Sequence, residues 1–351
     1  MNHLHGNQWR ESKRALDKKD RAKTRHFDTS CDTSAIGEIT YANEVDAPKG
    51  LVIGAALSRI SLLRLTDTKR QYDATLSQDA PKKLVKVVVP GDIVDITTKD
   101  DQAEVTGLTK RRNVLSRMRR DATRRSYANA QEQVIAANID VAAIVVSTQS
   151  PPLHPRFIDR YMILLQHNDI EPIVCLNKAD LATPQERDML NEYRRLGIVT
   201  LETSTIDHQG IDDLKDLLRD KTAVLVGQSG VGKTSIINTL DPTAGYMTSE
   251  VSLRSGRGRH TTTTSTLHEW AENSYIIDTP GIRSLEIWDI DKHDLQFYYP
   301  EFEPYIAECK YSDCLHMNEP FDDCAVKQAV GQPDDISTPR YESYLKILNE
   351  L

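Results

Sequence analysis

A glycine-rich segment that ends in a lysine and a threonine offers the chemistry of phosphate binding. Residues 227–234 read GQSGVGKT and fit the spacing G-x-x-x-x-G-K-[ST]. Glycines let backbone N–H groups curl around phosphates, Lys233 supplies a positive charge for the β and γ oxygens, and the Thr234 hydroxyl can coordinate Mg²⁺. The apolar run 223–226 before the segment and the amphipathic stretch after it favour a P-loop over a chance glycine-rich turn. The predicted phosphate contacts are Gly227, Gln228, Ser229, Gly230, Val231, Gly232, Lys233, Thr234 and Ser235, with Lys233 also a candidate catalytic residue.

A second motif, Asn177-Lys178-Ala179-Asp180, follows the apolar run 172–176 and could recognise a nucleotide base. A carboxylate at this place can accept hydrogen bonds from the N1–H and N2 amine of guanine, and adenine offers no such donor pair. An ordinary turn at a strand end is the alternative, and the P-loop in the same chain favours guanine. The run Thr203-Ser204-Thr205 could close over the base through its backbone. The predicted base contacts are Asn177, Lys178, Asp180 and Ser204.

The segment Asp278-Thr279-Pro280-Gly281 ends a further apolar run, 274–277. In phosphoryl-transfer enzymes of this type an aspartate holds Mg²⁺, here through a water, and the glycine N–H can contact the γ-phosphate. We therefore predict that Asp278 and Gly281 bind GTP together with Mg²⁺, and that Asp278 and Thr234 lie beside the metal.

A hydroxyl-rich segment, RSGRGRHTTTT at 254–264, lies between the P-loop and Asp278. It is typical of a switch loop that orders on the γ-phosphate and Mg²⁺, and a plain surface loop is the alternative. Thr262 is the predicted metal ligand in it. His260 is a candidate catalytic residue, with a positioning or RNA-contact role as an equal alternative. Ile282 stands where Ras-like enzymes place a water-orienting glutamine, so intrinsic hydrolysis should be slow or should use another group.

Three cysteines and a histidine lie within 16 residues near the C-terminus: Cys309, Cys314, His316 and Cys324. Three thiolates and one imidazole are a complete tetrahedral set for a structural zinc ion, with no open position for catalysis. Scattered free thiols and a surface histidine are the alternative. Cys175 lies in an apolar run and is expected in the core.

The net charge of −8 hides an uneven distribution. Residues 1–125 carry a net charge of +8, and residues 126–351 carry −16. The run 106–125 is the densest basic cluster, and such a cluster is suited to contact a phosphate backbone. A solvated linker is the alternative. The candidate RNA contacts are Lys110, Arg111, Arg112, Arg117, Arg119 and Arg120.

The hydrophobic pattern divides the chain into five segments. Residues 35–106 hold about five short β-rich runs (35–41, 50–57, 60–65, 84–89 and 92–97), which predicts a small barrel of the OB type. From 126 apolar strands alternate with helical stretches, which predicts a parallel sheet with helices on its faces. The predicted layout is a basic tail at 1–34, the barrel at 35–106, a basic linker at 107–125, an α/β P-loop GTPase domain at 126–289 and a helical zinc-binding domain at 290–351.

Composition excludes several classes of protein. No apolar run approaches the ~20 residues of a membrane helix, and the N-terminus has no apolar core of a secretory signal. Five cysteines in 351 residues do not make a disulfide scaffold, which indicates a reducing, cytoplasmic location.

The motif order is unusual, because Asn177–Asp180 precedes the P-loop and Asp278 follows it. Most small GTPases run P-loop, DxxG, NKxD. The same site forms if the chain is cut and rejoined elsewhere, since termini often lie close together at the surface. Such a circular permutation places the switch segments directly before the C-terminal domain, so that the nucleotide state could move that domain.

Together these motifs resemble the ribosome small subunit-dependent GTPase A family (RsgA, also YjeQ). The resemblance rests on the barrel, KRRNVLSR at 110–117, NKAD before GQSGVGKTS, the GRGRHTTT loop, DTPG and the Cys/Cys/His/Cys cluster, and it covers roughly 35–330. One departure is the spacing between His316 and Cys324, which has seven residues here and about five in the family pattern.

The resemblance implies a circularly permuted GTPase that binds the small ribosomal subunit and its rRNA and acts in late subunit maturation. It implies hydrolysis of GTP to GDP stimulated by the subunit, with Mg²⁺ and one structural Zn²⁺. We also expect a monomer with no membrane partner. A GTP-switched RNA-binding factor with incidental hydrolysis is the alternative, and a small-molecule kinase is disfavoured by NKAD and the basic patches.

Overall fold

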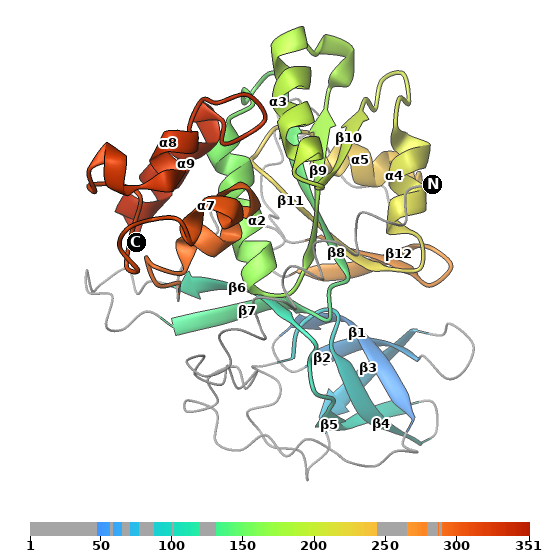
Figure 1. Ribbon diagram of the computed structural model, residues 1–351. Helices are drawn as coiled ribbons and strands as arrows, with labels where there is room; N and C mark the ends of the chain where they lie inside the picture. The colour runs from blue at the N-terminus through green and yellow to red at the C-terminus, as the bar shows by residue number, and fades with distance from the viewer. Residues whose placement is uncertain are drawn as a thin grey trace.

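The computed structural model divides into a barrel, a central sheet with helices on both faces, and a C-terminal helical cluster (Figure 1). It describes residues 48–56, 59–64, 71–76, 88–99, 102–119, 131–243, 265–278, 287 and 290–351. The predicted tail at 1–34, the predicted strand at 35–41 and the predicted switch loop at 254–264 lie outside these residues.

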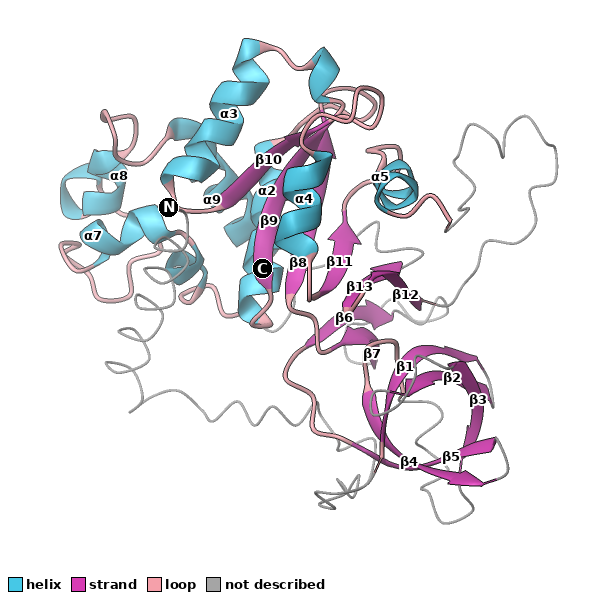
Figure 2. Ribbon diagram, turned by 90° about the vertical axis from the view of Figure 1, so that its right-hand side faces the viewer, coloured by secondary structure: helices cyan, strands magenta, loops and turns pink. Residues whose placement is uncertain are grey.

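Five strands close into a barrel (Figure 2). They are β1 (Lys49–Ala56), β2 (Arg59–Arg64), β3 (Gln71–Leu76), β4 (Ile93–Lys99) and β5 (Gln102–Leu108). Their order is β1-β2-β3-β5-β4, and β4 pairs back with β1. Alternate residues such as Ile60, Leu62, Val94 and Ile96 point inward and are fully buried.

The number of barrel strands matches the prediction, and their positions match in part. β1, β2 and β4 lie at the predicted runs, whereas β3 and β5 were not predicted. Val88 and Val89, the described end of the predicted run 84–89, form no strand. The Asp92 carboxylate accepts a hydrogen bond from the Val89 N–H at 2.8 Å, which fixes a turn there instead of a ladder.

A two-stranded hairpin joins the barrel to the central sheet. It consists of β6 (Val114–Arg119) and β7 (Gln131–Ala137), so part of the predicted linker is a strand. The turn at 89–92 before β4 contacts the hairpin closely. The Ala137 N–H donates to Pro90 O at 3.0 Å, and a Cβ on Gly91 would lie 2.1 Å from Ala137 O. Only glycine fits at this contact.

The central sheet has the predicted alternation of strands and helices. Its strands are β8 (Val141–Ser147), β9 (Glu171–Asn177), β10 (Val199–Thr203), β11 (Thr222–Val226), β12 (Thr266–Ala271) and β13 (Ser274–Asp278). Their order is β10-β9-β8-β11-β13-β12, with the first five parallel and β12 antiparallel to β13. The sheet continues into the barrel, because Thr266 of β12 pairs with Gly54 of β1.

Helices cover both faces of this sheet, which explains why all seven residues of β8 are buried. The helices are α2 (Pro155–His167), α3 (Pro184–Arg195), α4 (Ile211–Leu218) and α5 (Lys233–Leu240). Ala142, Ile144 and Val146 of β8 pack toward α2 and α3. Val141, Ala143 and Val145 pack toward α4 and α5 on the other face.

The C-terminal cluster consists of short helices and one longer one. They are η5 (Leu295–Tyr298), η6 (Pro300–Phe302), α7 (Glu303–Ile306), η7 (Phe321–Asp323), α8 (Ala325–Ala329) and α9 (Thr338–Glu350). Their separate core includes Phe302, Tyr344 and Ile347, and Ile163 of α2 joins it. Among the helices that the structure describes, none has the length and apolar character to cross a bilayer.

Candidate nucleotide and metal sites

The predicted nucleotide motifs meet at one edge of the central sheet. Asn177 at the end of β9 lies level with Ser147 of β8 and Thr203 of β10. Val224 of β11 pairs with Ile277 of β13, so Asp278 ends its strand beside the start of the P-loop. Ligands of open α/β sheets bind outside this carboxyl edge, which is where the motifs converge.

The P-loop has the compact geometry that its sequence predicts. Gly227, Gly230 and Gly232 have φ values of 151°, 87° and 98°, a region that favours glycine. A Cβ on Gly227 would lie 2.3 Å from Val145 O. The Lys233 ammonium donates to the carbonyl oxygens of Gly227 and Gln228, both at 2.8 Å, and so lies folded across the loop. The lysine charge is thereby held at the centre of the loop.

Asn177 braces the P-loop from the neighbouring strand. Its buried Nδ2 donates to Val231 O at 2.9 Å, and its Oδ1 accepts from the Thr203 hydroxyl at 3.3 Å. A Cβ on Gly232 would lie only 2.2 Å from Asn177 Nδ2. The base motif and the phosphate loop are therefore in direct contact through one side chain.

The two charged residues of the base motif lie nearer the surface. Lys178 has a left-handed backbone with φ of 60°, and its ammonium donates to Gln149 O at 2.8 Å. Asp180 lies in the short helix η4 (Ala179–Leu181) and is exposed. Its carboxylate is thus accessible to a base. Ser204 is buried, and its N–H donates to Gln209 O at 3.0 Å, which shapes the loop after β10.

Oxygen donors suited to Mg²⁺ are present at the phosphate end. Thr234, the last residue of the P-loop motif, is the second residue of α5, and Asp278 ends β13 next to β11; both are half-buried. A hydroxyl and a carboxylate are the hard donors that Mg²⁺ prefers, and the ion would neutralise phosphate charge. Thr262, His260 and Gly281 lie outside the described residues.

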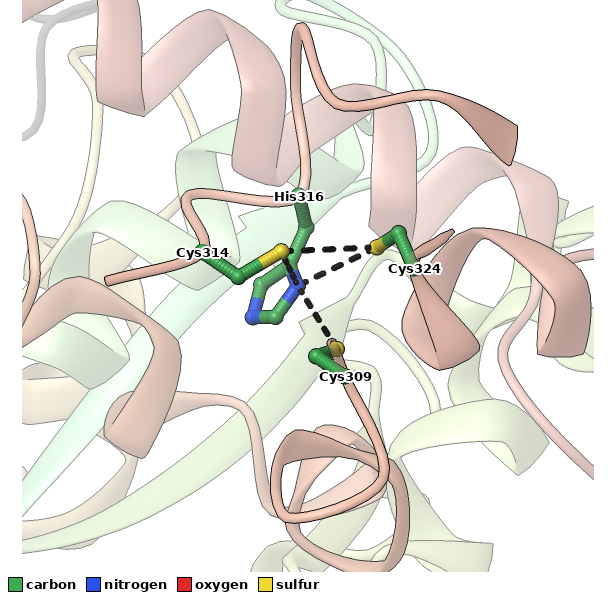
Figure 3. Close-up of side chains that lie close together, drawn as sticks. All are labelled: Cys309, Cys314, His316 and Cys324. Carbon is green, nitrogen blue, oxygen red and sulfur yellow. Dashed lines mark hydrogen bonds between the residues drawn. The ribbon is translucent and has the colours of Figure 1, made fainter. Parts of the chain in front are cut away.

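The predicted zinc ligands form one cluster (Figure 3). The His316 Nδ1 lies 3.6 Å from Cys309 Sγ, 3.2 Å from Cys314 Sγ and 3.4 Å from Cys324 Sγ. Cys314 Sγ and Cys324 Sγ are 3.7 Å apart. Around a tetrahedral zinc ion, neighbouring ligand atoms lie about 3.5–3.8 Å apart. The four donors fit such an ion, and the longer loop before Cys324 closes on the cluster.

The surroundings of His316 favour metal ligation. Its Nε2 contacts Gln296 Oε1 at 2.8 Å, so the Nε2–H donates there and Nδ1 faces the sulfurs with its lone pair. Burial lowers the pKa of His316 to about 4, which keeps the imidazole neutral. Burial raises the pKa of the Cys314 and Cys324 thiols, so a divalent cation would be needed to hold them as thiolates.

The predicted RNA contacts differ in their surroundings. The Arg111 guanidinium forms a bidentate ion pair with Asp92, with Nε 2.7 Å from Oδ1 and Nη2 2.8 Å from Oδ2. The Arg111 side chain is only 10% exposed. Arg111 therefore holds the barrel turn. Lys110 is exposed, Arg112 is 61% exposed beside Asp140, and Arg117 contacts Gln133 on the β6–β7 hairpin. Arg120 lies outside the described residues, as does the side chain of Arg119.

Two supporting contacts were not predicted from the sequence. Gln296 lies 20 residues before His316 on a separate short helix, and Thr203 lies 26 residues after Asn177. Neither separation belongs to a known ligand spacing. The run 203–205 was expected near the base, but not the hydrogen bond from Thr203 to Asn177, and only the packed structure identifies Gln296.

A P-loop and an NKxD motif at the carboxyl edge of an α/β sheet, in this chain order, define a circularly permuted P-loop GTPase. The RsgA GTPase family model matches residues 108–288, which is more than half of the chain. The chain belongs to this family and is a GTP-hydrolysing enzyme.

Relatives cover most of the chain. The small ribosomal subunit biogenesis GTPase RsgA of Chlorobaculum tepidum is 38% identical over 291 residues, 80% of this chain and 90% of its own. The protein of the same name from Borrelia garinii is 38% identical over 266 residues, 75% of this chain and 83% of its own.

Two solved structures share the fold. YjeQ from Thermotoga maritima is 27% identical with a TM-score of 0.67, covering 87% of this chain and 98% of its own. YloQ, described as a circularly permuted GTPase, is 27% identical with a TM-score of 0.65, covering 88% and 96%.

Proposed function

We propose that this GTPase binds the small ribosomal subunit and its rRNA and acts in late subunit maturation, with hydrolysis to GDP and phosphate stimulated by the subunit. The observation that carries the nucleotide part is the direct contact between the base motif and the P-loop through Asn177 and Gly232. The names of the relatives support the ribosomal part.

The barrel and the hairpin are the proposed rRNA-binding parts. A five-stranded barrel of the OB type commonly binds oligonucleotides. Lys110 and Arg112 lie between the barrel and the hairpin, Arg117 lies on the hairpin itself, and their charges can neutralise backbone phosphates. We leave Arg111 out of the proposed contact set because its guanidinium is paired with Asp92 and its side chain is nearly buried, whereas Arg112 is largely exposed beside Asp140.

The remaining assignments follow the sequence. Residues 35–106, 126–289 and 290–351 are the proposed barrel, GTPase and zinc-binding domains, and the protein would act in the cytoplasm as a monomer. Asp180 would recognise guanine, and Thr234, Asp278 and Thr262 would hold Mg²⁺. His260 is the proposed catalytic side chain of the switch. Cys309, Cys314, His316 and Cys324 would hold one structural zinc ion, which can contribute on the order of 10 kcal/mol to folding a small domain.

GTPase activity with and without purified small subunits tests the ribosomal part. We expect slow hydrolysis of GTP alone, negligible hydrolysis of ATP, and a rise by orders of magnitude when small subunits are added. Large subunits are the matched control. Equal rates with small subunits, large subunits and buffer would show that the proposed partner is wrong.

Replacing Lys233 by alanine tests the phosphate loop. The variant should lose measurable GTP binding, because it removes the ammonium that is folded across the loop and would meet the β and γ phosphates. Lys215→Ala on α4, where the lysine pairs with the exposed Asp212, is the control and should bind GTP normally. Normal binding by Lys233→Ala would contradict the P-loop assignment.

A GTP-switched RNA-binding factor with incidental hydrolysis is the second candidate, and Ile282 favours it. Isoleucine cannot orient water, so GTP could serve mainly to change the affinity for RNA. Subunit release separates the two candidates. If release needs hydrolysis, a non-hydrolysable GTP analogue should trap the complex, and if hydrolysis is incidental, the analogue and GTP should give the same release.

A further inference from the structure

A buried arginine joins the C-terminal cluster to the GTPase sheet. Arg340 of α9 is 2% exposed, and its guanidinium donates to Asp159 of α2. It also forms two hydrogen bonds with Glu301 of η6, at 2.7 and 3.2 Å. The guanidinium lies over the rings of Tyr299 and Tyr193, 4.5 and 5.4 Å from their centroids. One side chain therefore contacts elements of both parts of the molecule.

Arg340 keeps its positive charge although its side chain is buried. Burial disfavours the charge of Arg340, but the carboxylates of Asp159 and Glu301 outweigh it and hold the pKa of Arg340 above its ordinary range. Replacing one partner of such a buried pair typically destabilises a protein strongly, whereas an apolar replacement of the whole set is often neutral. Stability alone is thus a weak explanation for the cluster.

Asp159 is connected to the base motif through α3. The Tyr193 hydroxyl donates to Asp159 Oδ1 at 2.7 Å and lies 3.2 Å from Pro155 O at the start of α2. Tyr193 lies on α3, and Arg187 of the same helix donates to Ala179 O of the base motif at 3.3 Å. This route runs from Arg340 to the residue between Lys178 and Asp180.

A second route runs along the loop before α2. Lys178 donates to Gln149 O at 2.8 Å and lies 3.4 Å from Ser150 O. A Cβ on Gly230 of the P-loop would lie 2.9 Å from the same Ser150 O. The loop enters α2 at Pro155, whose carbonyl lies by Tyr193. Both routes therefore meet at the Tyr193–Asp159 contact.

We propose that Arg340 is a positioning residue for the nucleotide site, which acts through Asp159 and Tyr193 on the base motif and on the loop 149–151. Docking of the C-terminal cluster and binding of the guanine nucleotide are then linked, and each strengthens the other by the same factor. The inference rests on the assignment of residues 177–180 to the base. It adds a link that does not pass through the switch segments.

Affinity for GDP in three conservative variants tests the proposal. Asp159→Asn weakens the contact between Arg340 and α2, and Tyr193→Phe removes the shared hydroxyl but keeps the ring. Glu301→Gln weakens the contact that Arg340 makes within the C-terminal cluster, leaves its contact with α2 in place, and is the matched control. We expect the Kd for GDP to rise about five- to tenfold in the first two variants, the lower range of typical coupling. In Glu301→Gln it should stay within about twofold.

The combined variant separates positioning from loss of stability. Because Asp159 and Tyr193 act through one contact, Asp159→Asn with Tyr193→Phe should weaken GDP binding no more than either change alone. A purely structural role would lower the thermal midpoint of all three variants and leave their GDP affinities equal to that of the unchanged protein, which would overturn the proposal.

Hydrogen exchange measured on the wild-type protein tests the link without any variant, so a folding defect of a variant cannot affect the result. Since the linkage is reciprocal, saturating GDP should slow amide exchange in α9 around 340–348 more than in barrel strand β4. Equal effects in both elements would contradict the link. If the wild-type protein bound GDP no better than ADP, the assignment of residues 177–180 to the base would fail. If it bound GDP selectively but Asp159→Asn and Tyr193→Phe had the same GDP affinity as the wild-type protein, only the positioning role would be overturned.

Discussion

Single polar side chains set the geometry of the nucleotide site. Asn177 is fully buried, and both of its amide atoms are used, one on the P-loop and one on Thr203. Its amide lies so close to Gly232 that the backbone has no room for a side chain. The glycine before Lys233 thus has two reasons to be glycine, its positive φ and this contact.

Gly232→Ala should abolish tight nucleotide binding, because the new methyl would displace Asn177 and push the P-loop from β9. Gly197→Ala is the matched control. Gly197 also has a positive φ, of 77°, but nothing lies within 4 Å of its would-be Cβ. Backbone strain of about 1 kcal/mol is common to both variants. GDP titration should show loss of binding only for Gly232→Ala; equal binding in the two would refute the contact argument.

Motif spacing predicts these residues better than it predicts their partners. The P-loop, the base motif and the zinc ligands were predicted because each chemistry fixes residue types at short separations. The role of Arg111 could not be predicted, because a basic run does not reveal which of its members faces a buried carboxylate. Asp92 lies 19 residues away, and only the closed barrel brings its carboxylate to that guanidinium.

At the scale of elements, hydrogen bonds to one glutamate shape the segment between the zinc candidates His316 and Cys324. The Glu319 carboxylate accepts hydrogen bonds from the N–H groups of Leu315 and Met317, both at 2.7 Å. Lys327 of α8 donates to Glu319 O at 2.6 Å. These bonds fold the seven residues between His316 and Cys324 into a turn that returns the last sulfur to the cluster.

Cys324→Ser should lower the zinc content of the purified protein from about one ion per chain to well below one, because an ordinary serine hydroxyl is a poor zinc ligand. The C-terminal cluster should then unfold at a lower temperature than the GTPase part. Cys175→Ala removes a buried thiol outside the cluster and should keep the zinc. Full zinc occupancy in Cys324→Ser would exclude this cysteine as a ligand.

The sequence predicts the central elements well and the barrel less well, for a physical reason. Strands buried on both faces, such as β8, are continuous apolar runs and leave no doubt. β3 reads QYDATL, with one face exposed to solvent, and was missed. Its polar and apolar residues alternate, but over only six positions and with a small residue, Ala74, at the buried site, so pairing partners decide the position of such a strand.

At the scale of the molecule, the barrel is fixed to the GTPase sheet by polar contacts. The Asn138 side chain accepts from the Arg112 N–H at 2.9 Å and donates to Gly91 O at 2.9 Å. Asn113 contacts Ile139 from the other side, with its Oδ1 accepting the Ile139 N–H at 2.8 Å. Because of these contacts and the β1–β12 pairing, we expect the barrel to keep a fixed orientation relative to the GTPase sheet.

Asn138→Gly tests this junction without backbone strain, because glycine accepts the φ of 55° that Asn138 adopts. The variant leaves two backbone groups without their partners, and we expect a loss of about 1–3 kcal/mol in the free energy of unfolding. Asn273→Gly, at an exposed turn with φ of 52°, is the control and should be close to neutral. Urea unfolding measures both, and equal stabilities would mean that the junction bonds contribute nothing.

Charge distribution gives the last prediction, which concerns how the whole molecule faces RNA. The net +8 of residues 1–125 opposes the −16 of the remainder, so RNA should approach the barrel and hairpin side. Replacing Arg112 and Arg117 together by glutamine should weaken binding to small subunits and make it less dependent on salt. Each lost phosphate contact reduces the slope of log K against log salt by about 0.7–0.9, so two contacts give about 1.4–1.8. Glutamine at Arg195 and Arg219, exposed on α3 and after α4, removes the same charge from the acidic part and should leave the slope unchanged. If both double variants changed the slope equally, net charge and not the barrel side would govern association.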